Sequence, residues 1–236
     1  MEKDMVREAR KGHLRIVGPN CIGVQCFESK VSFRLTNLQE GPGSIAFLGQ
    51  SGGITSSFVA MATTRDIRLN KVVSYGNQID LRLEDYLEYL ADDDKISLIA
   101  CYVEDIKDVN KFLKALKRTT AKKPVIILKG GKTELGSKAA ASHTGAMASN
   151  YTIWEAAVRQ HGGLLVDDFD QLMHLVMMGT ATRTPRGKRV GFLGAGGGVS
   201  VLFSDLAVQA GLALPELSAE SQRRISEKIM GVNTST

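Results

Sequence analysis

The chain has 236 residues, of which 43% are hydrophobic and 23% charged, and its formal net charge is +5. This composition is ordinary for a soluble globular protein with one large or two modest domains. Because only 6% of the residues are aromatic and the basic runs are short, as in "KALKRTTAKK", we expect no nucleic-acid-binding surface.

Short apolar segments alternate with helical patterns along the chain. The opening residues indicate a charged helix. Further helices are expected where apolar residues recur at helical spacing, at 53–66, 81–94, 108–120 and 150–162. Buried strands are expected where the segments are brief, β-branched-rich and bounded by Gly or Pro, at 14–19, 44–50, 71–76, 96–104, 124–130 and 163–168.

This alternation predicts both the fold and the domain organisation. Strands that alternate with helices form a parallel sheet covered on both faces, so we expect an α/β fold with a doubly wound sheet. The polar segment "TRTPRGKR" places a domain boundary near Thr184, which separates residues 1–184 from residues 185–236. The second part has too few elements to close a sheet, so we expect it to be the truncated start of a second, similar domain.

A glycine-rich turn between the strand at 44–50 and the next helix is a candidate anion site. Open α/β sheets bind ligands beyond the carboxyl ends of their strands, and helix N-termini favour negative charge. Gly52 and Gly53 allow close approach of the backbone, and Ser51 adds a hydroxyl group. The turn therefore predicts a phosphate site; the alternative is a tight turn without a ligand.

The same turn also matches a motif of serine hydrolases. "GQSGG" fits the G-x-S-x-G nucleophile elbow, with Ser51 as the nucleophile. A hydrolase would need a histidine later in the chain, for which His143, His161 and His174 are available. Only one predicted strand precedes the elbow and no HGGG-type stretch is present, so we keep this interpretation as the weaker one.

A second glycine-rich turn begins the second domain. "VGFLGAGGGVSVLF" repeats the pattern of "IAFLGQSGGITSSF", with a predicted strand, a turn and a helix. It is a weak dinucleotide fingerprint, because Val199 stands where the third glycine belongs. We predict a second phosphate turn formed by Gly194, Ala195, Gly196, Gly197 and Gly198.

Polar residues also follow other predicted strands. Glu104 ends the strand at 96–104, and Asn77 and Asp80 follow the strand at 71–76. A functional carboxylate and a solvated strand-end acid are equally compatible with Glu104. Asn77 and Asp80 are equally suited to a role in turns or as helix caps.

One histidine differs from the others in its setting. His143 lies among small residues in "AASHTGAMAS", which predicts a loop histidine that other groups can reach. His161 is expected at a helix end, and His174, in the apolar pattern "QLMHLVMM", is expected to pack in the core.

The remaining features concern location and metals. Three cysteines without a CxxC pair make a zinc site or a disulfide framework unexpected, and they fit a reducing cytoplasm. No apolar run approaches the roughly 18 residues of a membrane span, and no signal peptide is evident. We therefore expect a cytoplasmic protein without a metal site of its own or a membrane partner.

Six motifs occur along the chain in the order "GPNCIGV", "LGQSGGI", "YGNQIDL", "YVE", "ASHTGAMA" and "GAGGGV". Together they resemble the NDP-forming acyl-CoA synthetases, a family that includes ADP-forming acetate–CoA ligase and the α subunit of succinyl-CoA synthetase. The resemblance covers nearly the whole chain.

The resemblance implies a role for each motif. A flavodoxin-like domain would carry His143 as a phosphohistidine, with Glu104 hydrogen-bonded to its ring. The phosphate site would include Gln50, Ser51, Gly52, Gly53 and Gly145. The acyl and CoA site would be lined by Gly18, Pro19, Asn20 and Asn77.

The resemblance also implies the reaction, in which ATP, a small carboxylic acid and CoA are interconverted with acyl-CoA, ADP and phosphate. The nucleotide and Mg²⁺ would be bound mainly by an ATP-grasp domain or subunit, and we expect an oligomer. By comparison with the full-length pattern of that family, we expect the N-terminal CoA-binding domain and the ATP-grasp module to lie outside these 236 residues. A non-catalytic regulatory module of similar sequence is the main alternative, although such modules tend to lack the histidine.

Overall fold

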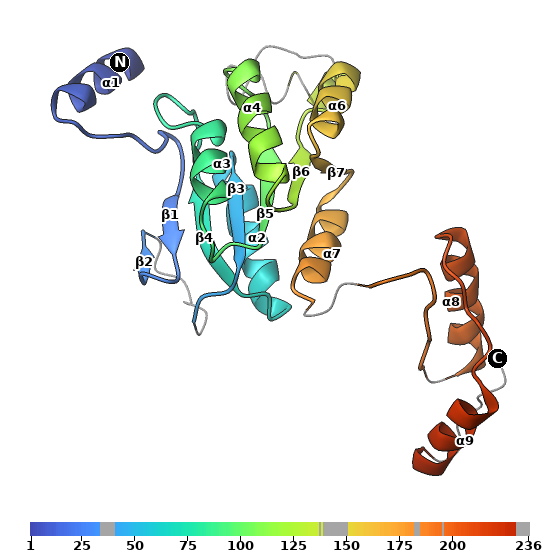
Figure 1. Cartoon of the computed structure of the whole chain (residues 1–236). Coiled ribbons are helices and arrows are strands. Elements are labelled where there is room, and N and C mark those ends of the chain that lie inside the picture. Colours follow the sequence, from blue (N-terminus) through green and yellow to red (C-terminus); the bar gives the residue numbers. More distant parts are fainter. Residues whose placement is uncertain (34–40, 137, 139–150, 182–184, 195, 230–236) are drawn as a thin grey trace. The chain divides into compact units, whose positions relative to one another are not determined.

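The computed structural model describes residues 1–236 apart from 34–40, 137, 139–150, 182–184, 195 and 230–236. The chain divides into two compact units, Met1–Ala181 and Thr182–Thr236. The predicted boundary residue, Thr184, lies outside the described residues. The first unit contains a seven-stranded sheet in the order β2-β1-β4-β3-β5-β6-β7 (Figure 1).

The sheet is parallel over most of its width. Strands β4, β3, β5, β6 and β7 pair in parallel, whereas β1 is antiparallel to both β2 and β4. The expected doubly wound α/β fold is therefore confirmed, with an antiparallel hairpin added at one edge. The strands are β1 Gly23–Cys26, β2 Val31–Ser32, β3 Ile45–Gly49, β4 Leu69–Ser74, β5 Leu98–Val103, β6 Val125–Lys129 and β7 Leu164–Val166.

The strand expected at 14–19 does not form, and this prediction was wrong. The carbonyl groups of Ile16, Gly18 and Pro19 accept hydrogen bonds from the loop after β4, at 3.1, 3.2 and 3.0 Å. Pro19 has no N–H group to donate to a ladder, and Gly18 has a φ of +104°. The segment thus lies along a loop, and the hairpin strand β1 begins only at Gly23.

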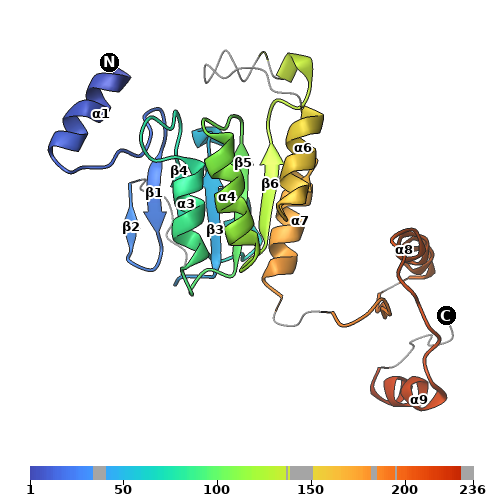
Figure 2. The ribbon, with the colours of Figure 1, turned by 45° about the horizontal axis from the view of Figure 1, so that its top comes forward.

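Helices cover both faces of the sheet. Helices α3, α4 and α6 lie side by side over one face (Figure 2), and α2 and α7 pack on the other. Side chains fix several of the helix starts, since Asp108 accepts from the N–H of Lys111 and Asp168 from that of Gln171. The helices are α1 Glu2–Lys11, α2 Gly52–Thr64, α3 Leu83–Ala91, α4 Val109–Thr120, α6 Tyr151–Gln160 and α7 Phe169–Gly179.

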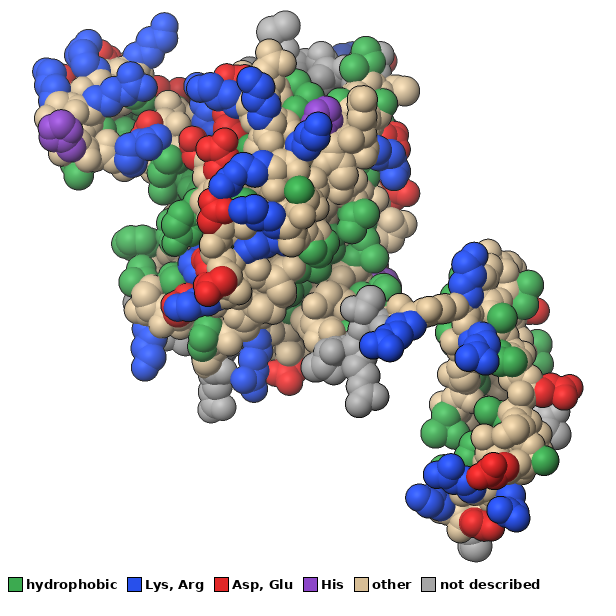
Figure 3. Space-filling view, in the orientation of Figure 1, with side chains coloured by type: hydrophobic (Ala, Val, Ile, Leu, Met, Phe, Trp, Pro, Cys, Tyr) green, Lys and Arg blue, Asp and Glu red, His purple; other side chains and the backbone are tan. Residues whose placement is uncertain are grey.

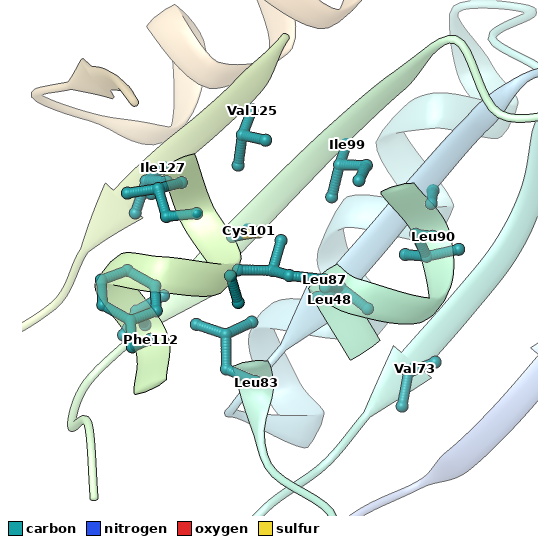
Figure 4. Packing of buried hydrophobic residues seen from close by; sticks show 14 of the residues in the cluster. Leu48, Val73, Leu83, Leu87, Leu90, Ile99, Cys101, Phe112, Val125 and Ile127 are labelled. Atoms are coloured by element: carbon teal, nitrogen blue, oxygen red, sulfur yellow. The ribbon is translucent and has the colours of Figure 1, made fainter. Parts of the chain in front are cut away.

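The core lies on both sides of the central strands. Each residue of β3 is buried, which explains why its sequence is continuously apolar and does not alternate. On one face, Leu83, Leu87 and Leu90 of α3 pack against Ile99 and Cys101 of β5 (Figure 4). His174 was expected in the core, but its side chain is exposed on α7, so that prediction was wrong.

Charged side chains of both signs are interspersed on the face of the first unit seen in Figure 3. Asp92, at the end of α3, forms ion pairs with Arg118 and Lys122 from the end of α4 and just beyond it. The hydrogen bond to Lys122, followed by that to Arg118, lowers the pKa of Asp92 to about 2. These pairs join two neighbouring helices at the surface.

The second unit contains α8 Gly197–Gln209 and α9 Ala219–Lys228. The helix expected after the second glycine-rich turn is therefore present. The strand expected before it is not, because the described residues there form only an isolated bridge between Arg189 and Ala213. A parallel strand needs neighbouring strands, and the described part of this unit supplies none. None of the described helices is long and apolar enough to span a membrane.

Candidate functional site

The strand order reverses at β3, which defines the position of the site. From β3 the chain proceeds through α2 to β4 on one side, while β5 pairs with the other side of β3. Ligands of open α/β sheets bind in the crevice beyond the carboxyl ends of the strands at such a reversal. The predicted site residues after β3, β4 and β5 all lie at this edge of the sheet.

The first glycine-rich turn leads from β3 into α2. Ser51 is the N-cap of α2 and accepts a hydrogen bond from the N–H of Ile54 at 3.4 Å. The first N–H groups of a helix, here those of Gly52 and Gly53, have no intrahelical acceptor. Gly53 is exposed, and a Cβ atom placed there would meet only the Ser51 hydroxyl, at 3.8 Å. The turn thus offers N–H groups at a helix N-terminus, as an anion site requires.

Gln50 has a different environment from its neighbours in this turn. Its side chain is 4% exposed, and its Oε1 atom accepts hydrogen bonds from the main-chain N–H groups of Glu104 at 2.7 Å and Asp105 at 2.9 Å. Gln50 was predicted for the phosphate site, but its side-chain oxygen is engaged with the chain after β5.

Glu104 directly follows β5 and lies beside the ends of two neighbouring strands. Its carboxylate is hydrogen-bonded with the hydroxyl group of Tyr102. Burial raises the pKa of Tyr102, and the charge of Glu104 and this hydrogen bond raise it further. A Cβ atom on Gly130 would lie 2.5 Å from the Tyr102 hydroxyl and 3.4 Å from Cγ of Glu104. Gly130 therefore leaves the space that this pair occupies.

The residues predicted for the acyl and CoA site are brought together. Asn77 donates its main-chain N–H to the carbonyl of Pro19 at 3.0 Å, and the side chains of Asn20 and Asn77 are 3.4 Å apart. Gly76 makes this approach possible, because a Cβ atom there would lie 2.1 Å from the Pro19 carbonyl oxygen. Gly18 lies in the same loop. The N-terminal loop and the loop after β4 thus form one wall of the site.

Asp80, for which a cap or turn role was considered, holds the N-terminal loop in place. It pairs with Arg15 at 2.9 Å and accepts from the N–H of Ile16 at 2.8 Å. The hydrogen bond from Arg15 outweighs the effect of burial and lowers the pKa of Asp80. The N-cap position of α3 is instead occupied by Arg82.

A cleft of about 410 Å³ lies beside the wall formed by the N-terminal loop and the loop after β4. It opens between α1 and the segments that follow β4 and β5. Three of its side chains are cationic, which would suit an anionic ligand. The lining residues are Glu2, Lys3, Val6, Asn77, Gln78, Ile79, Arg82 and Lys107.

Sequence reasoning missed two residues at this edge, Lys129 and Gln78. Lys129 ends β6 and is 7% exposed; it donates from Nζ to the carbonyl of Glu104 at 2.8 Å, and burial lowers its pKa. Gln78 is 2% exposed and donates from Nε2 to the carbonyl of Asp105 at 3.2 Å. The available signal for Lys129 was a lysine that ends an otherwise apolar strand, "PVIILK".

His143 and Gly145 lie outside the described residues, as does Ala195 of the second turn. The segment 139–150 connects the region after β6 with α6. Lys132 precedes this segment, and its Nζ atom lies 5.6 Å from the centroid of the ring of Tyr151, which is the first residue of α6. The described flanks of the histidine segment therefore meet at the carboxyl edge of the sheet.

The second glycine-rich turn contrasts with the first. Gly196 is the N-cap of α8 with a φ of +96° and no side-chain hydrogen bond. Added Cβ atoms on Gly196, Gly197 and Gly198 would meet nothing within 4 Å. A Cβ atom on Gly194 would meet the ring of Phe192. Within the described part of the second unit, no side chains lie close to the three glycines at the start of α8.

The nucleophile-elbow interpretation receives no geometric support. Ser51 has an extended backbone with φ −97° and ψ 129°, whereas an elbow serine occupies a strained turn. Nδ1 of His161 donates to the carbonyl of Ala157, 2.7 Å away, at the C-terminal end of α6. His174 is exposed on α7. Among the described residues, no three His, Cys, Asp or Glu side chains group as a metal site would require.

Similar proteins are found among the acyl-CoA ligases. The chain is 39% identical over 220 residues to the α subunit of an ADP-forming acetate–CoA ligase II of Pyrococcus furiosus, covering 93% of this chain and 48% of that protein. It is 33% identical to an ADP-forming acetate–CoA ligase of Methanocaldococcus jannaschii, covering 91% of this chain and 30% of that protein. The chain thus spans half or less of the length of these relatives.

A solved structure agrees with these sequence matches. An acetyl-coenzyme A synthetase of Ca. Korarchaeum cryptofilum, solved with phosphate and ADP, superimposes with a TM-score of 0.84 at 27% identity, covering 100% of this chain and 51% of that one. The sequence-family model of the succinyl-CoA ligase-like flavodoxin domain matches residues 42–178, from just before β3 into α7. The chain belongs to the family of succinyl-CoA ligase-like flavodoxin domains, whose relatives here are ADP-forming acyl-CoA ligases.

Proposed function

We propose that this chain carries the phosphohistidine step of an ADP-forming acyl-CoA synthetase. His143 takes a phosphoryl group from ATP as the bond to ADP breaks, and passes it to the carboxylate of a small acid. CoA then displaces phosphate from the acyl phosphate to form the thioester. ATP and Mg²⁺ are bound mainly by an ATP-grasp domain or subunit. The acid and CoA meet the wall formed by Gly18, Pro19, Asn20 and Asn77.

The observation that carries this proposal is the convergence of two features at one edge of the sheet. Glu104 follows β5, and the turn of Ser51, Gly52 and Gly53 follows the adjacent β3. The flanks of the segment that contains His143 meet at the same edge. A carboxylate and a helix N-terminus are the two groups that a phosphohistidine needs.

The two features have different tasks in the proposed step. A phosphorylated histidine carries nearly two negative charges, comparable to other phosphorylated side chains. Hydrogen bonds from main-chain N–H groups to such a charge contribute roughly 1.5–3 kcal/mol each, so two or three stabilise it without trapping it. A carboxylate on one ring nitrogen fixes the tautomer and leaves the other nitrogen nucleophilic.

The experiment is a phosphorylation assay on the full-length protein with its nucleotide-binding partner. After incubation with ATP and Mg²⁺, intact mass measured under alkaline conditions should increase by one phosphoryl group. Peptide mapping should place the group on the peptide that contains residues 140–149. The variant His143→Asn should take up none.

The other histidines provide the controls. His161→Asn and His174→Asn should be phosphorylated like the wild type. Phosphate on either of these residues instead of His143 would refute the proposal. Labelling of Ser51 by a fluorophosphonate would favour the hydrolase, and the intact "SHTGA" argues against a regulatory module without catalysis.

A further inference from the structure

The two residues after β5 are held in an unusual way. Both of their main-chain N–H groups and both of their carbonyl groups bond to buried side chains from other parts of the chain. Oε1 of Gln50 accepts from Glu104 and Asp105, at 2.7 and 2.9 Å. Nζ of Lys129 donates to the Glu104 carbonyl at 2.8 Å, and Nε2 of Gln78 donates to the Asp105 carbonyl at 3.2 Å.

The sheet explains why side chains are needed here. The parallel ladder between β5 and β6 ends with Val103 opposite Lys129, so Glu104 and Asp105 lie beyond the end of this ladder. Polar main-chain groups that leave a ladder in a buried region require other partners. The residues that supply these partners follow β3 and β4 or end β6.

The three side chains are buried, and burying polar groups costs free energy unless they form hydrogen bonds. Gln50, Gln78 and Lys129 are 4%, 2% and 7% exposed, and these polar side chains are rarely buried without hydrogen bonds. Gln78 is itself fixed at its other end, because its Oε1 accepts from the N–H of Leu83 at 3.3 Å. Each of the three side chains therefore has little freedom to move away.

We propose that Gln50, Gln78 and Lys129 are positioning residues that fix the carboxylate of Glu104 at the site edge. They hold the main chain on both sides of the Glu104 Cα atom, so that the side chain starts from a fixed point and direction. The hydrogen bond with Tyr102 then restrains the carboxylate itself. This inference rests on the proposed function, in which Glu104 orients His143.

Gln50→Met is the most informative variant, because methionine has a similar length and lacks the amide oxygen. Amide hydrogen exchange, measured by mass spectrometry on the full-length protein, should lose protection in the peptide spanning residues 100–108. The matched control is Gln25→Met. Gln25 is also a buried glutamine, 7% exposed and bonded to Ser32 at 3.0 Å, but it lies on β1. The control should leave that peptide protected.

The functional arm is a double-mutant cycle on the single-turnover rate of phosphorylation by ATP and Mg²⁺. Gln50→Met should lower the rate by about ten- to a hundredfold, the effect of a small misplacement. Glu104→Gln should lower it to a similar degree. In the Glu104→Gln background, adding Gln50→Met should lower the rate by less than about twofold. The effects of two residues are not additive when one acts through the other.

The outcomes separate the inference from the proposed function. If the two losses multiply, Gln50 acts independently of Glu104 and the inference is wrong. Unchanged exchange in Gln50→Met would likewise show that the main chain is not held by Gln50. If Glu104→Gln phosphorylates at the wild-type rate, the role of Glu104 in the proposed function is wrong and the inference falls with it. Gln78→Met, with the same expected pattern, serves if Gln50→Met does not fold.

Discussion

The two glycine-rich turns of this chain have similar sequences and very different surroundings. Residues 45–53 and 190–198 align as "IAFLGQSGG" and "VGFLGAGGG". The first follows a strand whose residues are all buried, and its serine caps α2. The second follows residues that form no strand, and its Gly196, Gly197 and Gly198 face open space among the described residues.

The difference shows what a glycine pattern can and cannot specify. In both turns it allows a helix to begin, at Gly52 and at Gly197. The surrounding groups of the first turn come from elsewhere in the sequence. Ile22 lies 3.2 Å from where a Cβ atom on Gly52 would be, and Gln50 connects the turn to the chain after β5. An anion site therefore depends on the strands beside the turn as much as on its glycines.

The largest expected effect tests whether the first turn acts through its main chain. Gly53→Val keeps the main-chain N–H group, but its branched side chain would block the approach of a phosphoryl group to the turn. We expect the single-turnover phosphorylation rate to fall by about 10²–10³-fold, as when a hydrogen-bond donor to a developing charge is lost. The fold should tolerate the change, because Gly53 is exposed with nothing closer than 3.8 Å to its Cβ position. Ser51→Ala removes one donor among several and should cost about tenfold or less. The reverse order of effects would favour the nucleophile elbow.

The next effect compares stability at matched positions. Gly49→Ala would place Cβ 2.1 Å from Oγ1 of Thr55 and 2.8 Å from the ring of Phe47, both buried, so we expect a loss of about 1–3 kcal/mol. Gly194→Ala meets only the ring of Phe192, which is 37% exposed and can move, so we expect less than about 0.5 kcal/mol. Urea unfolding measures both. Equal losses would contradict the comparison.

A smaller effect concerns the cap of α2. Ser51→Ala removes the hydrogen bond to the N–H of Ile54 and should lower the free energy of unfolding by about 0.5–1 kcal/mol. The bond length of 3.4 Å favours the lower part of that range. The melting temperature of Ser51→Ala is compared with that of Ser57→Ala, which changes an exposed serine later on α2. The difference between the two variants measures the contribution of the cap. Identical melting temperatures would show that the cap contributes nothing.

The smallest effect is expected at the surface of the first unit, away from both turns. The pKa of Asp92 is lowered from 3.8 to about 2 by Lys122 and then Arg118. A lowered carboxyl pKa stabilises the fold above pH 3.8, and this contribution is lost as the pH falls towards 2. NMR titration should give a pKa near 2, and Asp92→Asn should weaken the acid dependence slightly. A pKa near 3.8 would show that the ion pairs do not persist in solution.

The sequence predicted the parallel core of the fold well and its edges poorly. Strands β3 and β5 are continuous apolar runs, and nearly all of their residues are buried, as are those of β6. The segment 14–19 has the same composition, but Pro19 and the φ of Gly18 direct its carbonyl groups to a loop. The pairing of β1 with β4 depends on that loop and could not be deduced from local pattern.

The site was predictable where its residues end strands, and unpredictable where it depends on buried polar side chains. Glu104 and the turn at 51–53 follow strands, so the topology alone brings them to one edge. Gln78 has no local signal of its own, because it follows a glycine and an asparagine, which are typical of a turn. Its contact with Asp105 requires that the ends of β4 and β5 both lie beside β3, which only the assembled sheet provides.

The position of β3 at the centre of the sheet has a consequence for folding kinetics. Ile45 at its start is opposite Leu69 on one side and Leu98 on the other. Both partner strands therefore lie far from β3 along the sequence. Such long-range pairing is slow, because loop closure precedes the gain from contacts. The polar groups at the strand ends therefore come together only when the central strands of the sheet have paired. A ligand held between them would stabilise the folded state of the entire sheet, and partial unfolding at any one of the central strands would release it.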